Sequence, residues 1–484
     1  EEHIVDVNCE SKSMGNMLKD EITQVLKTTL YPKLDVLMQQ YDNSNTIITI
    51  DYLPVSIPNT NVKNWKTKLV EESLSQIETY FQANINTINT HNQQDKLADE
   101  IQKIDFQHYV QQLFLDFLLT GTLKSNTISD ELVTIYHQLV IDTIFAEKLR
   151  IALAKNSSAI LRWSVNIPET IKQKLVSLFT KEISFKTIQK TTQEIKDKLF
   201  YEKIEITDLK MLKGFLNYVY WVAFFKRKST LKKSEKETII KNGGTYFGFD
   251  SRTTENIIHQ LNNSSKKETY LSNFIEQFSS ISTQDENRIA KDDNLNKIIT
   301  EVLEDYNNPK KEKKNTQYWY LKNAGLIIFH PFLLTLFKNI GYLKKDHTWK
   351  NTQMQHRAVL LVQYLINGKE IIFENDLILN KILCGVPIHQ SVFTEWEITS
   401  EEKKQCQSLL QSVIEHWSVL KNTSIATLQE SFLQREGKLA IKENGNFELW
   451  VEQKSIDLLL DQLPWGISTI KTSWMENYII THWN

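Results

Sequence analysis

Residues 318–332 have the sequence Tyr-Trp-Tyr-Leu-Lys-Asn-Ala-Gly-Leu-Ile-Ile-Phe-His-Pro-Phe, and they open the stretch around which the chain is organised. Aromatic rings, helices that end at glycine and a final series of short strands predict a compact α+β domain here. The same stretch also contains Leu-Asn-Lys-Ile-Leu-Cys-Gly at 379–385, Phe-Leu-Gln-Arg-Glu-Gly-Lys-Leu at 432–439 and Leu-Asp-Gln-Leu-Pro-Trp-Gly-Ile-Ser at 460–468.

Proline and glycine mark the helix boundaries of this domain. Pro331 lies inside the apolar helix predicted over 323–337 and should break it, because proline removes a backbone donor. The helix predicted over 352–367 ends at Gly368, as helices with a left-handed cap do. The remaining predicted elements are helices over 377–383, 399–417 and 424–434, a hairpin with its Asn-Gly turn at 444–445, and closing strands over 466–471 and 478–483.

The chain begins with a predicted strand–helix–strand–helix region. Residues 3–9 alternate weakly and predict a strand, and the β-branched residues of 47–53 predict a second strand. Apolar residues recur every three or four positions over 11–40, which predicts a helix that Pro32 kinks or splits near Tyr31. The other predicted elements here are a helix over 64–84, with Trp65, Leu69, Leu74, Ile77 and Phe81 facing inward, and a polar loop over 85–105.

Helices dominate the centre of the chain until its composition changes after 225. A helix that carries Phe114 and Phe117 ends at Gly121, and the nearly all-apolar residues 205–225 form a further helix. Polar residues dominate from there to 315, with short helical segments predicted near 253–262, 269–282 and 293–306, and no heptad run indicates a coiled coil. The predicted fold class is mainly α with small β elements (α+β), divided into an N-terminal α+β and helical domain (1–160), a helical segment (161–225), a polar linker-like middle (226–316) and a C-terminal α+β domain (317–484).

Composition excludes several classes of function. The formal net charge of -2 gives no basic field of the kind that binds nucleic acid. The apolar runs at 216–225 and 324–337 are too short to span a bilayer. Three widely spaced cysteines without a CxxC motif indicate a reducing compartment and no zinc ribbon. No secretory signal opens the chain, and the absence of an initial Met indicates a trimmed start.

No residue pattern predicts catalysis, a metal or a cofactor. The histidines at 330, 389 and 416 form no pair at helical spacing, and there is no HExxH motif. Cys384 with His389 is the nearest approach to a nucleophile and base, but Cys384 continues an apolar helix, which favours a core position. We therefore predict a protein that is not an enzyme.

Five residues are candidates for structural or interaction roles: Arg435, Gly437, Trp465, Trp417 and His330. Arg435 lies where a helix ends and Gly437 lets the chain turn, so its guanidinium either bridges carboxylates of its own domain or pairs with a partner subunit. Trp465 stands at a rigid Pro-Trp-Gly turn, where a large ring belongs either to the core or to an interface.

Several of these motifs resemble the tape-measure proteins of bacterial contractile injection systems, the phage-tail-like particles of the antifeeding-prophage type. The C-terminal resemblance rests on Asn323–Leu326, His330–Phe332, Leu379–Lys381, Cys384-Gly385, Trp417, Lys421–Thr423, Phe432–Gly437 and Asp461–Trp465. The N-terminal resemblance rests on His3-Ile4, Leu30–Pro32, Ile48–Leu53 and the helix ending Thr-Gly-Thr-Leu at 120–123. Together they cover roughly 280 residues and leave the middle unmatched.

The resemblance implies a structural role in the assembly of such a particle, in which the protein sets the length of the tube and sheath. A terminal adaptor or assembly chaperone of the same particle is the alternative, and a cryptic hydrolase is a distant one. The implied partners are inner-tube, baseplate or cap proteins and further copies of the chain, with no nucleic acid and no stable membrane span. The implied location is the cytoplasm during assembly and then the particle itself.

Overall fold

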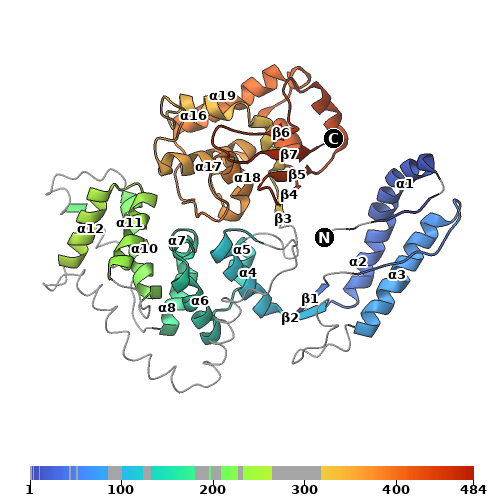
Figure 1. The fold of residues 1–484 in the computed structure, drawn as a ribbon, viewed down its shortest axis with the longest axis horizontal. Helices are drawn as coiled ribbons and strands as arrows, with labels where there is room; N and C mark the ends of the chain where they lie inside the picture. The colour runs from blue at the N-terminus through green and yellow to red at the C-terminus, as the bar shows by residue number, and fades with distance from the viewer. Residues whose placement is uncertain are drawn as a thin grey trace. The chain divides into compact units, whose positions relative to one another are not determined.

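The computed structural model of the protein describes residues 3, 5–9, 11–42, 45–50, 53–84, 101–123, 132–179, 196–197, 209–226, 233–263 and 318–483. Its contacts divide the chain into two units, Glu1–Val110 and Gln111–Asn484, whose elements are labelled in Figure 1. Helices dominate and the strands form two small sheets, so the predicted fold class is confirmed. The finer division into four segments stays a prediction.

The first unit is built on a long helix that a proline interrupts. α1 (Lys12–Val25) and α2 (Tyr31–Gln39) are joined by a π-helix over Leu26–Leu30, directly before Pro32. Proline has no amide hydrogen to donate, and the wider π-turn accommodates the bond that is lost. The α-helical hydrogen-bond pattern is thus interrupted near Tyr31, where a kink or split was predicted, but the backbone stays helical and is not split.

α3 (Trp65–Asn84) packs along this interrupted helix, and the prediction of a helix over 64–84 is confirmed. Trp65, Ile77 and Phe81 are buried as predicted, whereas Leu69 and Leu74 are only partly buried. Two small clusters hold the helices together, and their buried members are Ile22, Val25, Leu26, Leu30, Trp65 and Val70 in one and Leu37, Ile77 and Phe81 in the other.

The strands of the first unit differ from the prediction in two ways. β1 (Thr46–Ile50) was predicted. Its antiparallel partner β2 (Ile101–Asp105) lies in the stretch that was predicted to be a loop because polar residues dominate it. Residues 5–9 are irregular, so the predicted N-terminal strand is wrong for them. Val5 and Val7 are 38% and 46% exposed, and little burial is available to fix a strand.

The second unit begins with a helical layer around an aromatic core. Trp163 and Trp221 are fully buried with their ring centroids 5.3 Å apart, and Phe225 packs edge-on against Trp163 at 5.7 Å. Gly121 adopts a φ of +78° at the predicted helix end. The helices of this layer are α4 (Phe106–Thr120), α5 (Leu132–Gln138), α6 (Thr143–Lys155), α7 (Ser157–Asn166), α8 (Glu169–Phe179) and α10 (Leu209–Lys226).

α11 (Lys233–Tyr246) and α12 (Ser251–Asn263) extend this layer into the polar middle of the chain. The helix near 253–262 was predicted, but α11 was not, because polar residues dominate this part of the sequence. A Cβ at Gly243 would lie 2.2 Å from the Tyr218 ring, so glycine here allows α10 to approach α11 closely. The helices predicted near 269–282 and 293–306 lie outside the described residues.

Most of α17 (Thr352–Asn367) is buried at the centre of the C-terminal domain, and Gly368 caps it with a φ of +66° as predicted. The predicted break at Pro331 is confirmed, because a 3-10 helix η3 (Ala324–Phe329) ends before it and α16 (Leu333–Asn339) starts after it. The other helical elements are η4 (Glu374–Leu377), α18 (Ile378–Leu383), α19 (Ser400–His416), η5 (Ser418–Leu420), α20 (Ile425–Leu428), the π-helix η6 (Gln429–Leu433) and the 3-10 helix η7 (Ser455–Gln462).

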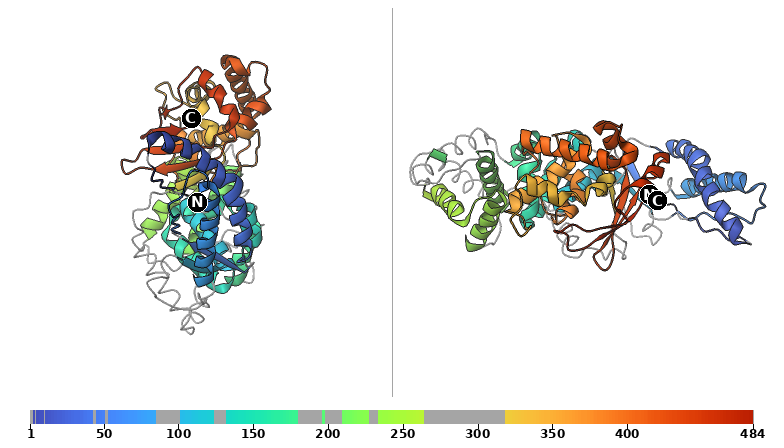
Figure 2. Two further views of the ribbon diagram at one scale, coloured as in Figure 1. Left: turned by 90° about the vertical axis from the view of Figure 1, so that its right-hand side faces the viewer. Right: turned by 90° about the horizontal axis from the view of Figure 1, so that it is seen from above.

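A five-stranded sheet completes this domain, in the order β3-β4-β5-β7-β6. The predicted hairpin joins β4 (Gly437–Ile441) to β5 (Phe447–Val451), and Gly445 takes a φ of +81° in its turn. The closing strands β6 (Thr469–Ile470) and β7 (Ile479–His482) are present but shorter than predicted, and β3 (Tyr318–Leu321) was not predicted. The strands gather at one side of the domain and helices α16, α17 and α19 at the other (Figure 1; Figure 2, right).

Candidate functional site

Two of the motifs quoted from the sequence meet at the start of η3. The Ala324 amide donates to the Arg435 carbonyl oxygen at 2.9 Å. A Cβ at Gly325 would lie 1.7 Å from the carbonyl oxygen of Phe432, and a Cβ at Gly437 would lie 2.6 Å from the Cβ of Ala324 and 2.9 Å from the carbonyl oxygen of Trp450. Glycine at 325 and 437 is therefore required because two backbone segments touch there.

A buried amide network connects a third motif to this contact. The Asn323 amide group donates to Asn380 Oδ1 at 2.8 Å and to Gln363 Oε1 at 2.9 Å. Asn380 in turn donates to the Val359 carbonyl oxygen at 3.2 Å, and neither asparagine is more than 3% exposed. Bonds of this kind compensate the cost of burying amides and fix η3 against α17 and α18.

Arg435 is fully buried and its bonds remain within its own domain. Its Nη2 lies 2.5 Å from Asp457 Oδ1, and its Nε donates to the Ser431 carbonyl oxygen at 2.6 Å. The other oxygen of Asp457 accepts from Trp483 Nε1 at 3.1 Å. Of the two roles that the sequence left open for Arg435, this geometry matches the bridge to an intradomain carboxylate.

The two candidate tryptophans and His330 also contact the backbone of this domain. Trp417 is fully buried and donates to the Leu459 carbonyl oxygen at 3.2 Å. Trp465 is partly buried and donates to the Ile328 carbonyl oxygen at 3.0 Å. His330 is half-buried, its Nδ1 lies 2.9 Å from the Ile327 carbonyl oxygen, and burial lowers its pKa.

η7 carries two exposed apolar side chains, Ile456 and Leu458, beside Leu459 and Leu460, which are partly buried against the core. No residue of η7 is buried, and Leu458 and Ile456 are 75% and 37% exposed. Apolar side chains that are exposed and lie close together often mark a site of contact with another protein. We define the 456–467 patch by Ile456, Leu458, Leu459, Leu460, Leu463 and Ile467.

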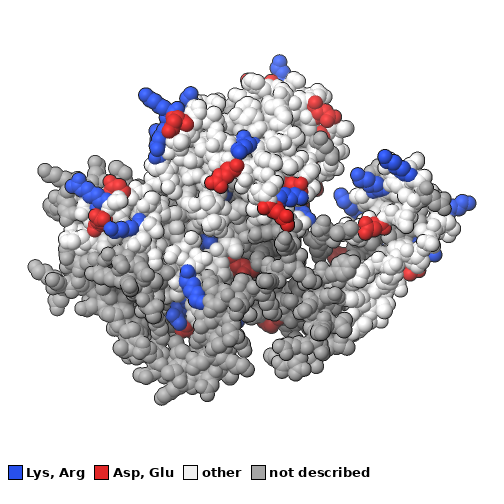
Figure 3. Space-filling view, viewed as in Figure 1, with Lys and Arg blue, Asp and Glu red and all other residues white. Residues whose placement is uncertain are grey.

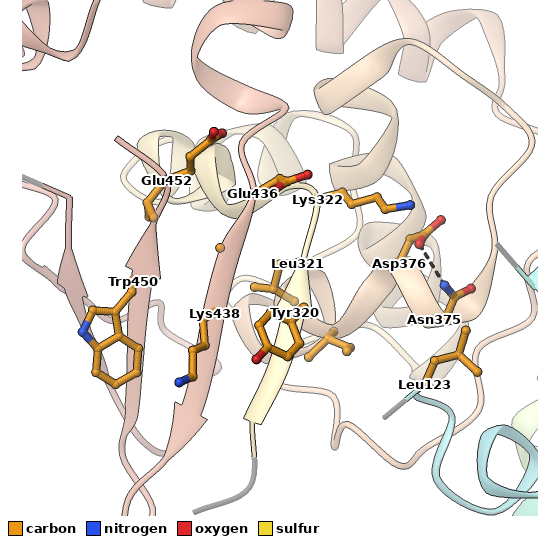
Figure 4. Close-up of a pocket in the computed structure, with 13 residues that line it drawn as sticks. Leu123, Tyr320, Leu321, Lys322, Asn375, Asp376, Glu436, Lys438, Trp450 and Glu452 are labelled. Atoms are coloured by element: carbon orange, nitrogen blue, oxygen red, sulfur yellow. Dashed lines mark hydrogen bonds between the residues drawn. The ribbon is translucent and has the colours of Figure 1, made fainter. Parts of the chain in front are cut away.

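An open hollow of about 560 Å³ lies beside the outer face of the sheet (Figure 4). Tyr320, Lys438 and Trp450 lie side by side across β3, β4 and β5, and Figure 4 shows their side chains in one row. The Lys438 ammonium lies 3.9 Å from the centroid of the Tyr318 ring. The lining carries both signs of charge, including Lys322, Asp376, Glu436 and Glu452, which does not favour a purely anionic or cationic ligand.

A buried ionic cluster joins the helical layer to the C-terminal domain. Arg162 donates two hydrogen bonds to Glu374, from Nε to Oε2 at 2.9 Å and from Nη2 to Oε1 at 3.1 Å. Both side chains are fully buried. Lys381 Nζ lies 2.8 Å from Glu374 Oε1. Burial would raise the pKa of Glu374, but the Arg162 and Lys381 charges outweigh it and hold that pKa below its usual value.

This ionic cluster was not predicted, although the sequence contains an indication of it. Arg162 and Lys381 both stand inside apolar helical runs, where an unpaired charge would be costly. Each cation therefore indicated a buried carboxylate, but Glu374 could not be chosen from the sequence. Asn166 also donates to Glu374, and the Leu118 and His389 carbonyl oxygens accept from Arg162 at 2.6 and 2.7 Å.

The cysteine and histidines considered as catalytic or metal-binding residues do not form such a site among the residues that the structure describes. Cys384 is fully buried and burial raises the pKa of its thiol, which keeps it protonated and unreactive. Its carbonyl oxygen and that of Gly385 accept from Gln355 at 3.0 Å. Among the residues that the structure describes, no group of three His, Cys, Asp or Glu side chains could hold a metal ion.

Comparison with protein families matches residues 1–483 to the family described as contractile injection system tape measure protein. The chain belongs to this family. The match includes the middle of the chain, which the resemblance seen in the sequence did not cover. No curated protein and no solved structure matches the chain.

This family member is thus a structural component of a contractile injection system. No helix within the described residues is long and apolar enough to cross a membrane. Lysine and arginine are interspersed with acidic residues on the face shown in Figure 3, without a field of one sign. The C-terminal motifs described above pack against one another, largely through bonds to the backbone, and none of them is arranged around a reacting group.

Gly325→Ala tests the contact between the motifs. The new Cβ would collide with the Phe432 carbonyl group, and we expect a loss of about 3 kcal/mol or more in the free energy of unfolding. Gly466→Ala is the matched control, because no atom lies within 4 Å of a Cβ there, and it should change stability by less than ~0.5 kcal/mol. Urea unfolding of both variants measures the difference, and equal stability would contradict the contact.

Glu374→Gln tests the ionic cluster. It leaves two buried cations without their carboxylate and should lower the free energy of unfolding by about 3–5 kcal/mol. Glu370→Gln removes an exposed carboxylate that pairs with Lys403, and it should cost less than about 1 kcal/mol. Similar losses for both variants in urea would show that burial of the cluster does not set its energy.

Lys172 provides a test by pH. It is 3% exposed, its ammonium donates to the Ser164 carbonyl oxygen at 2.7 Å, and burial lowers its pKa from 10.5 to about 8. The unfolded chain keeps this proton up to higher pH than the folded chain, so stability should rise by about 2 kcal/mol from pH 7 to 9.5. Lys172→Met should abolish the rise in chemical denaturation, and Lys174→Met, at an exposed position of the same helix, should retain it.

Proposed function

We propose that this tape measure family member acts in particle assembly as a folded adaptor that connects other particle proteins. The observation that carries the proposal is the packing of residues on both sides of 264–317 into one unit. Gln353 donates to the Phe247 carbonyl oxygen at 2.8 Å, and the Tyr246 ring packs edge-on against His356 at 5.2 Å. Arg162 and Glu374 join the same two parts through a fully buried ion pair.

A segment that measures length has to hold its two ends far apart. The residues on both sides of 264–317 pack into one unit, which opposes such a role for this segment. A loop with both ends attached to one body reaches at most half its contour length, roughly 90 Å at ~3.3 Å per residue. The segment is thereby better suited to tethering or contacting a partner than to measuring a tube. Setting of tube and sheath length remains the second candidate, favoured by the family match over residues 1–483.

The 456–467 patch is the surface that we propose for contact with a partner protein of the particle, such as an inner-tube, baseplate or cap protein. It combines the exposed Leu458 and Ile456 with a backbone held by Trp417 and Asp457, so a partner would meet a rigid apolar surface. Rigid apolar contacts of this kind lose little conformational entropy on binding. We place the protein in the cytoplasm during assembly and in the particle afterwards, with no catalytic role and no nucleic-acid partner.

Shortening residues 264–317 in frame tests the adaptor against the ruler. The adaptor proposal expects particles of unchanged sheath length by electron microscopy, because both ends of the segment stay in one folded unit. A sheath that shortens in proportion to the deletion would contradict the adaptor and support length measurement. Normal assembly in the absence of the protein would overturn both.

Leu458→Asp tests the patch. A charge at this 75% exposed position should leave the unfolding transition unchanged but reduce incorporation of the protein into particles at least tenfold. Ile371→Asp is the matched control, because Ile371 is 80% exposed and lies outside the patch. The quantity to measure is the amount of protein in purified particles, and equal incorporation of both variants would exclude the patch as the contact surface.

A further inference from the structure

The seam between α11 and α17 is formed by a small set of buried side chains. Tyr246 and Phe247 at the end of α11 face Gln353 and His356 on α17. Phe247 and His356 are each only 1% exposed. We call Tyr246, Phe247, Gln353 and His356 the α11–α17 seam.

His356 is held in the seam as a neutral ring. Its Nε2 lies 3.0 Å from Gln390 Nε2, which is a donor, so the ring nitrogen accepts and carries no proton. A protonated ring would present a donor to this donor and lose the bond. Tyr246 packs edge-on against the His356 ring, which at 1% exposure has almost no contact with water that could solvate an added charge.

One cation and one anion act on His356. Lys381 faces it from α18, Glu374 from η4 and Tyr246 from α11, and Arg162 from α7 pairs with Glu374. Two cations thus already share one carboxylate. Burial, together with the Lys381 charge, lowers the pKa of His356 to about 4, and Glu374 opposes them only in part.

We propose that His356 makes the α11–α17 seam acid-sensitive, so that its protonation releases α11 from α17. The added proton would be a third positive charge against a single carboxylate, and it would also break the bond to Gln390. Opening the seam exposes the ring to water and removes both penalties. Acid would then loosen the helical layer at the end of α11. α12 follows α11 in the chain, and residues 264–317 follow α12.

The sign of the effect follows from the two protonation states. A histidine in water takes up its proton near pH 6.5, whereas His356 in the closed seam does so near 4. The closed seam is therefore fully stable above pH 6.5 and loses stability as the pH falls from 6.5 to 4. These two values correspond to an opening constant that is about 30-fold larger at pH 5 than at pH 7.5.

Hydrogen exchange of the full chain tests the proposal. Amides of 239–249 should exchange about 30-fold faster at pH 5.0 than at pH 7.5, after correction for intrinsic exchange, while amides of α19 should not. His356→Gln should remove this pH dependence. His416→Gln, at an exposed histidine on α19, is the matched control and should keep it.

Gln390→Glu provides a second test that does not remove the histidine. A carboxylate at 390 would accept a bond from the protonated ring, so the seam should stay closed at pH 5.0. Equal protection of 239–249 at both pH values in the unmodified protein would overturn the proposal. Persistence of the pH dependence in both His356→Gln and Gln390→Glu would overturn it as well.

Discussion

The second unit depends on one ion pair between residues that lie 212 positions apart, Arg162 and Glu374. A carboxylate and a guanidinium with no exposed surface are stable only when every oxygen and nitrogen is well paired, because removal from water costs each ion several kcal/mol. Lys381, Asn166 and backbone carbonyl oxygens provide those partners. The helical layer and the C-terminal domain must therefore be packed together for either to bury its charges.

Features that depend on neighbouring residues were predictable from the sequence. Pro32 and Pro331 interrupt their helices where expected, and Gly368 and Gly445 take the left-handed conformations that their positions require. Thr399 and Glu402 form a capping box at the start of α19. In each case one or two adjacent residues decide the local backbone.

Features that depend on distant partners were not predictable. α11 is helical although it contains two adjacent glycines, because α10 packs closely on Gly243 and α12 packs closely on Gly244. β2 is a strand because β1 pairs with it, in spite of its polar residues. The residues of the ionic cluster could be suspected one at a time, but the choice of Glu374 as their partner required the folded chain. The sequence likewise left two roles open for Arg435, and the position of Asp457, which favours the intradomain bridge, required the folded chain.

Residues on either side of 264–317 belong to one folded body. The most direct measurement is to insert a specific protease site within 264–317, cut the purified protein, and follow the two fragments by size-exclusion chromatography. We expect the fragments to remain together at neutral pH and the two parts of the second unit to unfold in a single transition, because the Arg162–Glu374 pair and the α11–α17 seam hold them. Separation of the fragments without denaturant would contradict it.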